Sequence, residues 1–283
     1  MLLKEEQDLS FKVDRVFKSM LFLIKKIGGK MQIDFDNFYG EDYLKIYGED
    51  LERRTQAEVE FIDSTLNLKP GAKVLDLFCG YGRHAILLGK LNYQIVGIET
   101  SQYLLDVGLK KIEEAKLKEN ISFLKLNPAD INFSNEFDAV INMYTSFGFY
   151  ESDEQNFNLI EKSYNMLKPG GKFLLDLVNR EKVISLQPSK NWEEREGLFV
   201  LEAYNFNHLK GRAITRRIIL SNGLRKEGYI SIRLYTLAEL KNSMENVGFK
   251  INKVYGDYDG SLYNSQSPRM IPLVVKSQIP PNR

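Results

Sequence analysis

Short apolar runs and helical patterns alternate along the middle of the chain. The apolar runs occupy residues 73–78, 94–99, 121–126, 137–143 and 172–178. Apolar residues recur at helical spacing in residues 83–91, 102–118 and 154–167. Ser101 is a suitable cap for the second of these helices, and Lys-Pro-Gly-Gly at 168–171 ends the third. Strands that alternate with helices form βαβ units, so the pattern predicts a doubly wound α/β domain with a mostly parallel sheet.

Residues 192–234 interrupt this alternation. They are rich in β-branched and aromatic residues, and Asn222-Gly223 is a hairpin turn signal. They predict an antiparallel β insertion, with strands at residues 198–207, 212–220 and 229–234. After the insertion the pattern returns to a helix at 237–247 and to strands at 249–255 and 271–276.

The N-terminal segment has a different pattern. Apolar residues recur at roughly helical spacing from residue 11 to 27, with lysines and arginines between them. Such a helix could lie on a membrane surface or pack on its own domain or a partner, and we favour packing. We therefore expect residues 1–30 to be a peripheral helical extension and residues 31–283 to be a single domain that contains the insertion. Arg53 and Arg54 indicate a helix start, with a carboxylate-binding role also open.

The composition is that of an ordinary globular protein, with 43% hydrophobic and 27% charged residues. A net charge of +1 provides no general basic surface, so a nucleic-acid partner is not expected. The single cysteine, Cys79, excludes a disulfide framework and a cysteine metal site, and we expect no bound metal. No apolar run reaches membrane-spanning length and the first residues are acidic, which predicts a cytoplasmic protein.

The stretch VLDLFCGYGRHAILL, residues 74–88, carries the clearest binding pattern. Gly80, Gly82 and Ala85 match G-x-G-x-x-A between an expected strand and an expected helix. Glu99 ends the next strand, close to the spacing at which a carboxylate holds ribose hydroxyls. Many doubly wound folds carry this pattern, so it indicates a nucleotide-like ligand without naming one.

Asp76, just before the glycine loop, narrows the choice of ligand. A dinucleotide places its pyrophosphate at the helix N-terminus, where a neighbouring carboxylate would repel it. A buried aspartate also needs a partner, which either a ligand ammonium or the N–H groups of the loop can supply. Asp76 therefore favours a ligand with a ribose, a positive charge and no phosphate. S-adenosylmethionine has these features and NAD does not.

These residues resemble the class I S-adenosylmethionine-dependent methyltransferases. The motifs that carry the resemblance are VLDLFCGYG, IVGIET, NPADI at 127–131, FDAVINMYTSFGFY at 137–150 and LKPGGKFLLDLVN. The segment RLYTLAELKNSMENVGF then resembles the approach to the sixth strand, and CGYGRH and TSFG resemble the small-molecule branch. The resemblance implies a seven-stranded Rossmann-like sheet with an antiparallel last strand, and S-adenosylmethionine as cofactor.

The resemblance also implies which residues bind the cofactor. Asp76, Gly80 and Gly82 would surround the methionine part, Glu99 the ribose, Ala129 and Asp130 the adenine, and Met143 the reacting methyl. Cys79, Tyr81 and Thr100 complete the expected cofactor set.

Methyl transfer from a sulfonium is an in-line displacement, so the protein mainly aligns the reactants. An N or O acceptor that loses a proton can need a base, and the candidates are Tyr144 and His208. We expect His84 to be structural. The aromatics from Phe35 to Tyr47 either pack as a helix or form a flap over the cofactor.

We expect residues 192–234 to act as a lid over the acceptor pocket. Arg216 and Arg217 are adjacent in a strand, so one at most lines a pocket. The expected substrate residues are Tyr39, Tyr43, Tyr144 and Arg216. A small-molecule methyltransferase is the preferred function. An RNA or protein methyltransferase and a non-catalytic accessory protein stay open, and the sequence makes no prediction of oligomeric state.

Overall fold

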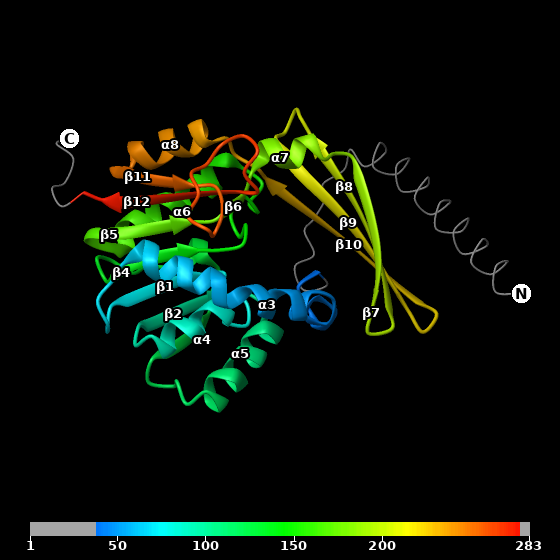
Figure 1. The fold of residues 1–283 in the computed structure, drawn as a ribbon, viewed down its shortest axis with the longest axis horizontal. Coiled ribbons are helices and arrows are strands. Elements are labelled where there is room, and N and C mark those ends of the chain that lie inside the picture. Colours follow the sequence, from blue (N-terminus) through cyan, green and yellow to red (C-terminus); the bar gives the residue numbers. More distant parts are fainter. Residues whose placement is uncertain (1–37, 278–283) are drawn as a thin grey trace, which may run out of the picture.

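The computed structural model describes residues 38–277 and contains the predicted doubly wound sheet (Figure 1). Its strands are β1 Lys73–Leu77, β2 Gln94–Glu99, β3 Ile121–Lys125, β4 Phe137–Asn142, β5 Leu167–Leu175, β11 Phe249–Tyr255 and β12 Arg269–Lys276. Their order is β11-β12-β5-β4-β1-β2-β3, and the short β6 Leu177–Val178 pairs with β12. β12 is antiparallel to both β11 and β5, whereas the other main pairs are parallel. This confirms the predicted sheet with its antiparallel last strand.

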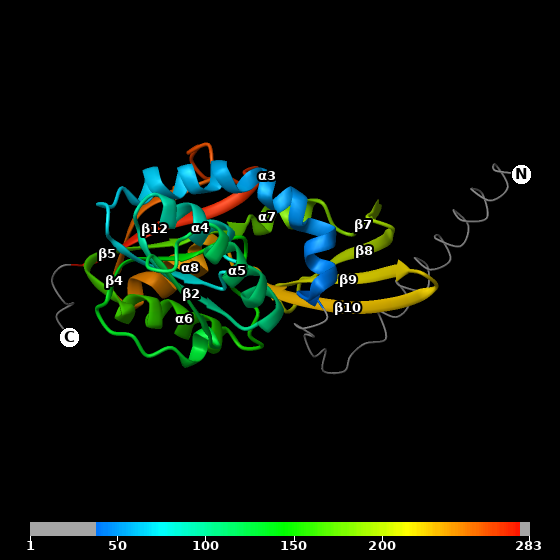
Figure 2. The same ribbon diagram turned by 90° about the horizontal axis from the view of Figure 1, so that it is seen from below.

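Helices cover both faces of this sheet. The helices within residues 38–277 are α3 Glu41–Leu66, α4 Arg83–Lys90, α5 Gln102–Glu114, α6 Asp153–Met166, α7 Arg180–Ser185, α8 Leu237–Asn246 and the 3-10 helix η1 Pro128–Asp130. Ile62 of α3, Leu88 of α4 and Ile112 of α5 belong to one core cluster, and Ile160 of α6 and Met244 of α8 belong to another. Figure 2 shows α3 and α6 on opposite sides of the sheet. The carboxyl ends of the strands stay accessible between these layers.

Two boundaries differ from the prediction for local reasons. The helix expected at 102–118 ends at Glu114, and Lys116 already has a left-handed φ of 58°. The strand expected at 172–178 starts earlier and is divided. β5 begins at Leu167, directly after α6, and its extension is interrupted at Asp176 before β6. Asp176 binds the turn that follows β4, as described below.

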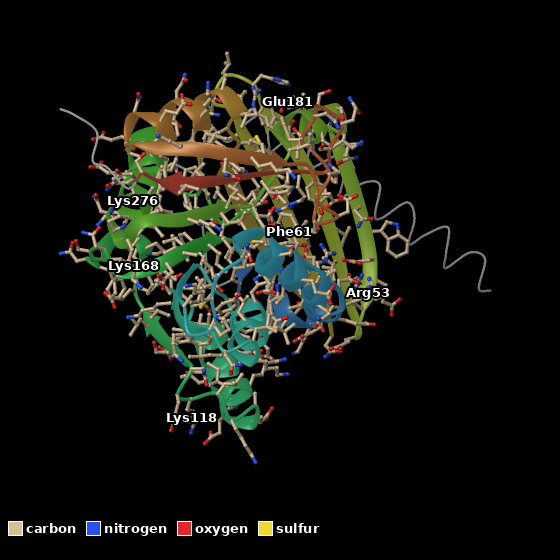
Figure 3. The ribbon with its side chains drawn as sticks, turned by 60° about the vertical axis from the view of Figure 1, so that its left-hand side comes forward. Arg53, Phe61, Lys118, Lys168, Glu181 and Lys276 are labelled. Carbon is tan, nitrogen blue, oxygen red and sulfur yellow. The ribbon has the colours of Figure 1, made fainter. Side chains whose placement is uncertain are left out.

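Helix α3 is longer than the sequence suggested. The arginine pair at 53 and 54 looks like a helix start, but the helix begins at Glu41 and the pair lies in its middle. Buried side chains recur from Ile46 to Leu66, so one apolar stripe holds all 26 residues against the protein. Phe61, labelled in Figure 3, packs edge to face on Tyr255, with 5.1 Å between the ring centroids.

The insertion forms a second, antiparallel sheet that projects beside the main one (Figure 1). Its strands are β7 Ser189–Arg195, β8 Leu198–Asn207, β9 Arg212–Ser221 and β10 Leu224–Arg233, in the order β10-β9-β8-β7. The predicted turn at Asn222-Gly223 joins β9 to β10, and both residues have positive φ. β7 was not predicted because its sequence, SKNWEER, is polar and largely exposed. The 1–30 extension lies outside the described residues.

Three glycines make room for one aromatic ring beside the glycine loop. The Phe123 side chain of β3 lies against Gly82 of the loop, Gly97 of β2 and Gly108 of α5. A Cβ on Gly97 would lie 2.6 Å from the ring, and a Cβ on Gly108 would lie 2.7 Å from the ring and 2.8 Å from the carbonyl oxygen of Tyr81. All three distances are too short for a real Cβ contact, so these positions require glycine.

We predict that Gly108→Ala destabilises the protein although Gly108 lies in a helix. A helical Gly→Ala change ordinarily stabilises by about 0.5–1 kcal/mol, but here overpacking should cost about 1–3 kcal/mol. Gly48→Ala in α3 is the matched control, because its new Cβ would meet only an atom at 3.9 Å. Urea unfolding should show opposite shifts for the two variants. A gain of stability for both would contradict the packing argument.

Candidate active site

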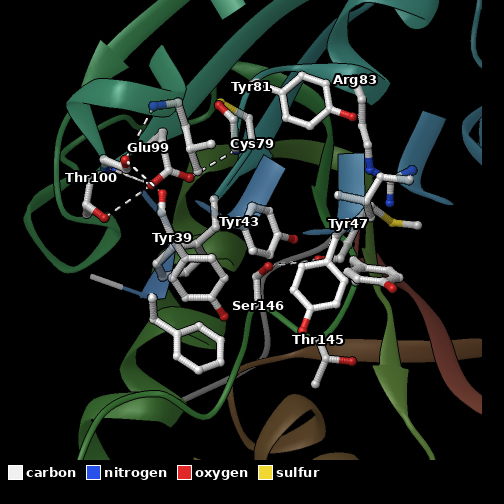
Figure 4. A pocket seen from close by; sticks show the side chains of 18 of the residues that line it. Tyr39, Tyr43, Tyr47, Cys79, Tyr81, Arg83, Glu99, Thr100, Thr145 and Ser146 are labelled. Atoms are coloured by element: carbon white, nitrogen blue, oxygen red, sulfur yellow. Dashed lines mark hydrogen bonds between the residues drawn. The ribbon is translucent and has the colours of Figure 1, made fainter. Parts of the chain in front are cut away.

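A cavity of about 260 Å³ opens at the carboxyl ends of β1, β2 and β4 (Figure 4). The predicted residues that line it are Tyr39, Tyr43, Asp76, Cys79, Gly80, Tyr81, Glu99, Thr100, Met143 and Tyr144. Gly82, Ala129, Asp130, His208 and Arg216 are not among its lining residues. The cavity is thus built by the glycine loop, the segments that follow β2 and β4, α3 and the second sheet.

The glycine loop and the end of β2 are joined by Glu99. Its carboxylate accepts hydrogen bonds from the backbone N–H groups of Gly80 (3.0 Å), Thr100 (2.7 Å) and Ser101 (2.9 Å), and from the Thr100 hydroxyl (3.2 Å). Gly80 has φ 58°, which allows its N–H to face Glu99. Four donors hold one buried carboxylate at the cavity wall, so its position is set before any ligand binds.

Asp76 and Arg83 bring unpaired charged atoms to the cavity. Asp76 is 1% exposed, and its Oδ2 has no hydrogen-bond partner in the described part of the chain. Burial, and to a smaller extent the Glu99 charge, raise the pKa of Asp76 to about 7, against the opposing effect of Arg83. Arg83 is 7% exposed and pairs with Glu58, while its Nη2 also lacks a partner within residues 38–277. The site therefore offers one free acceptor and one free cationic donor.

The histidine in the first turn of α4 has a structural role. His84 is buried, and its Nε2 lies 2.8 Å from Glu58 Oε2, the atom that also binds Arg83. Burial and the Arg83 charge lower the pKa of His84, so it is neutral at pH 7. His208 lies elsewhere, exposed on the β8–β9 turn with its ring against Phe206. The cavity wall therefore does not use His208.

A strained turn carries Tyr144 at the cavity wall. Tyr144 and Thr145 have left-handed φ values of 59° and 62°, which are costly for side chains of this size. Asp176 holds the turn, because its Oδ2 accepts from the Tyr144 N–H (2.8 Å) and its backbone oxygen from the Thr145 N–H (2.9 Å). Arg269 and Tyr258 also donate to the Asp176 carboxylate. The sequence analysis did not single out these three residues, since only the fold brings them together.

Three guanidinium groups surround the Tyr144 ring. Arg54, Arg83 and Arg269 lie 5.4, 5.3 and 5.6 Å from its centroid, and Arg54 Nη1 donates to the Tyr144 hydroxyl over 3.1 Å. Arg54 therefore lies beside the cavity, where the carboxylate-binding role left open by the sequence stays a prediction.

The opposite wall of the cavity is aromatic. Tyr43 stacks between Tyr39 and Tyr47, with ring centroids 5.1 and 5.2 Å apart, and Tyr39 lies edge to face with Phe149 at 6.4 Å. Burial raises the pKa of Tyr43 to about 12 and raises that of Tyr39 further. These hydroxyls therefore stay protonated at neutral pH.

Arg217, and not Arg216, is the arginine of the second sheet that lines the cavity. Arg217 donates to Glu202 (2.8 Å), to the Tyr47 hydroxyl (2.7 Å) and to the Phe38 carbonyl. Arg216 points to the other face, where it is almost fully buried and pairs with Glu227. Alternation along β9 predicted that only one of them would line a pocket, but not which one.

A more open hollow adjoins the cavity beyond Thr100. It shares Phe78, Thr100, Ser101 and Phe149 with the cavity, and Asn127 and Tyr150 also line it. Asn127 Oδ1 accepts from the Tyr150 hydroxyl (2.5 Å) and from the Ala129 N–H (3.0 Å). Asp130 is exposed on η1 beside it. Asn127 and Tyr150 lie in the quoted segments NPADI and FDAVINMYTSFGFY, but no local pattern in the sequence assigns either residue a role.

No group of three His, Cys, Asp or Glu side chains within residues 38–277 is placed to hold a metal ion. No helix in the same range is long and apolar enough to cross a membrane.

The sheet order, the antiparallel β12 and the glycine loop facing an acid on β2 define a Rossmann-like methyltransferase fold. A family model described as a methyltransferase domain matches residues 74–171. YqeM of Bacillus subtilis, which is named as a methyltransferase, is 21% identical over 77% of this chain and 89% of its own. These findings identify the chain as an S-adenosylmethionine-dependent methyltransferase, an enzyme that uses S-adenosylmethionine as methyl donor.

Solved structures share the fold at low sequence identity. A methyltransferase from Clostridium acetobutylicum, described as S-adenosylmethionine-dependent, has a TM-score of 0.73 at 17% identity and covers 83% of this chain and 98% of its own. The sugar N-methyltransferase KedS8 of a Streptoalloteichus species has a TM-score of 0.59 at 16% identity, covering 79% and 88%. At this identity the likeness concerns the fold alone.

We predict that Asp76 makes the ligand-free protein less stable as the pH rises. The native state holds the Asp76 proton up to about pH 7, whereas the unfolded chain releases it near pH 3.8. Wild type should therefore lose stability relative to Asp76→Asn between these values, by at most about 4 kcal/mol for three pKa units. Urea unfolding of both proteins from pH 4 to 8 measures the difference. Parallel curves would contradict a raised pKa.

Proposed function

We propose that this enzyme methylates a nitrogen or oxygen atom of a small molecule by in-line transfer. The observation that carries the cofactor part is the pair of unpartnered buried atoms, Asp76 Oδ2 and Arg83 Nη2. An ammonium and a carboxylate on one carbon would satisfy both, and S-adenosylmethionine carries this amino-acid group. A buried polar atom without a hydrogen-bond partner is costly. A ligand that pairs both Asp76 Oδ2 and Arg83 Nη2 removes this cost and therefore gains affinity.

The other predicted contacts fit the same orientation of the cofactor. Glu99, held by four donors, would accept hydrogen bonds from the ribose hydroxyls. The hollow beside Asn127 and Tyr150, next to Ala129 and Asp130, would take the adenine. Met143 and Tyr144 would then lie at the transferring end.

The cofactor supplies the reactive methyl group. The residues of this chain orient it and keep water from the reacting atoms. The strained turn at Tyr144 and the aromatic wall at Tyr43 meet at this end of the cavity. Both are buried or tightly hydrogen-bonded, which favours a fixed geometry for the displacement.

A small-molecule acceptor is favoured over RNA by the charges of the second sheet. Its arginines are already engaged: Arg217 pairs with Glu202, Arg216 with Glu227, and Arg212 binds backbone carbonyls. Paired charges offer little attraction to a phosphate backbone. The fold neighbour KedS8 is described as acting on a sugar nitrogen.

We predict that Asp76→Asn and Glu99→Gln change the affinities for two derivatives of the cofactor differently. S-adenosylhomocysteine contains the amino-acid group and 5′-methylthioadenosine lacks it. Asp76→Asn should weaken only S-adenosylhomocysteine, by about 10- to 100-fold for a charged hydrogen bond. Glu99→Gln should weaken both, because both contain the ribose. Calorimetry measures the six affinities of wild type and the two variants, with NAD as a non-binding control, and tight NAD binding would overturn the cofactor assignment.

We propose further that the second sheet is the lid of the acceptor pocket. Arg217 of β9 and Ile232 of β10 line the cavity, and Val200 and Ile219 pack on Ile46 of α3. These contacts place part of the second sheet at the cavity wall, which supports a lid role for it.

A larger side chain at position 232 tests the lid. Ile232→Trp should reduce transfer of labelled methyl to the acceptors found in a metabolite extract at least tenfold, because the ring would occupy acceptor space. The affinity for 5′-methylthioadenosine should stay within about twofold of wild type. An unchanged acceptor profile would contradict the lid.

A further inference from the structure

The cavity has an aromatic wall at the end where methyl transfer is proposed. The Tyr43 ring lies between those of Tyr39 and Tyr47, and Figure 4 shows it between the Cys79 side of the cavity and Ser146. The face of an aromatic ring attracts a cation that lies within about 6 Å of its centroid. The same wall already holds a protein cation in this way. The Arg217 guanidinium lies 3.7 Å from the ring centroid of Phe38 and 4.8 Å from the ring centroid of Tyr47.

The groups that line the cavity are poorly suited to remove a proton from an acceptor. In the proposed complex Glu99, which four protein donors already bind, holds the ribose hydroxyls, and Asp76 is paired with the ammonium of the cofactor. His84 Nε2 is held by Glu58. The Tyr144 hydroxyl accepts from Arg54.

The tyrosine hydroxyls and the thiol that line the cavity are also unsuited to accept a proton. Burial raises the pKa of Tyr39, Tyr43, Tyr81 and Cys79, so all four keep their protons at neutral pH. An alcohol must lose its proton as its oxygen attacks, and among residues 38–277 the cavity lining holds no group that is placed and free to accept it.

We infer, building on the proposed function, that the acceptor is an amine whose reacting nitrogen lies against the ring of Tyr43. A neutral amine attacks with its lone pair and needs no base beforehand. The N–C bond forms, the C–S bond breaks, and the electron pair of that bond stays on sulfur. The positive charge moves from sulfur to nitrogen, and the new ammonium later loses its proton to water. The aromatic wall stabilises the cation where it forms.

Sinefungin tests the wall without knowledge of the acceptor. It replaces the sulfonium and methyl of the cofactor by a carbon that bears an ammonium, and thus places a cation at the transferring end. The measured quantity is the affinity for sinefungin divided by that for S-adenosylhomocysteine. Wild type should prefer sinefungin. Tyr43→Leu should lower the ratio by about 3- to 30-fold, the range for one cation–π contact.

Tyr43→Phe is the matched control, because it keeps the ring and removes the hydroxyl. It should keep the wild-type ratio, and equal ratios in wild type and Tyr43→Leu would overturn the role of the ring. A loss in Tyr43→Phe as large as in Tyr43→Leu would also overturn it. If wild type bound neither compound, the proposed function itself would fail, which is a different result.

The chemical class of the product tests the acceptor. Wild type is incubated with methyl-labelled S-adenosylmethionine and a metabolite extract, and the products are separated on a cation exchanger at pH 5. The label should be retained on methylated amines, and transfer should rise with pH as the acceptor amine loses its proton. Label in a neutral O-methyl product would overturn the inference.

Discussion

The geometry of the cavity depends on the close packing of the Phe123 ring against three glycines. Gly82, Gly97 and Gly108 come from the loop, β2 and α5, and each lacks the Cβ that would collide with this ring. Their contact brings the glycine loop down onto the carboxyl end of β2. At that distance the Gly80 N–H reaches the Glu99 carboxylate at 3.0 Å. The hydrogen bonds of the site therefore follow from a packing constraint in the core.

The buried charges of Glu202 and Arg217 are paired in the second sheet, whereas two charged groups at the cavity keep an atom without a partner among residues 38–277. In the second sheet, Glu202 binds Arg217 and the Tyr47 hydroxyl, so a buried charge pair joins the sheet to α3. In the cavity, Asp76 and Arg83 each keep one polar atom without a partner in the described chain. Pairing those atoms internally would stabilise the empty protein, but it would leave no partners for the amino-acid group of the cofactor in the proposed complex.

The turn after β4 shows how backbone strain is maintained at the wall of the cavity. Two consecutive left-handed residues, Tyr144 and Thr145, persist because Asp176 binds both of their N–H groups. Asp176 is in turn held by Arg269 of β12 and by Tyr258 from the preceding loop. The antiparallel last strand thus contributes directly to the geometry of Tyr144, and not only to closure of the sheet.

The sequence by itself determined the class of fold and most of the cofactor edge. Apolar runs, helical periodicity and a glycine loop are local patterns, and Asp76, Gly80 and Glu99 lie within twenty-four positions of one another. Only the tertiary structure decided how the rest of the cavity wall is built. It selected Arg217 over Arg216, paired Arg83 with Glu58, and brought Asp176, Arg269 and Tyr258 to Tyr144. Arg217 meets Phe38 across 179 positions. Such contacts depend on how distant elements pack, and neither periodicity nor spacing along the chain encodes that packing.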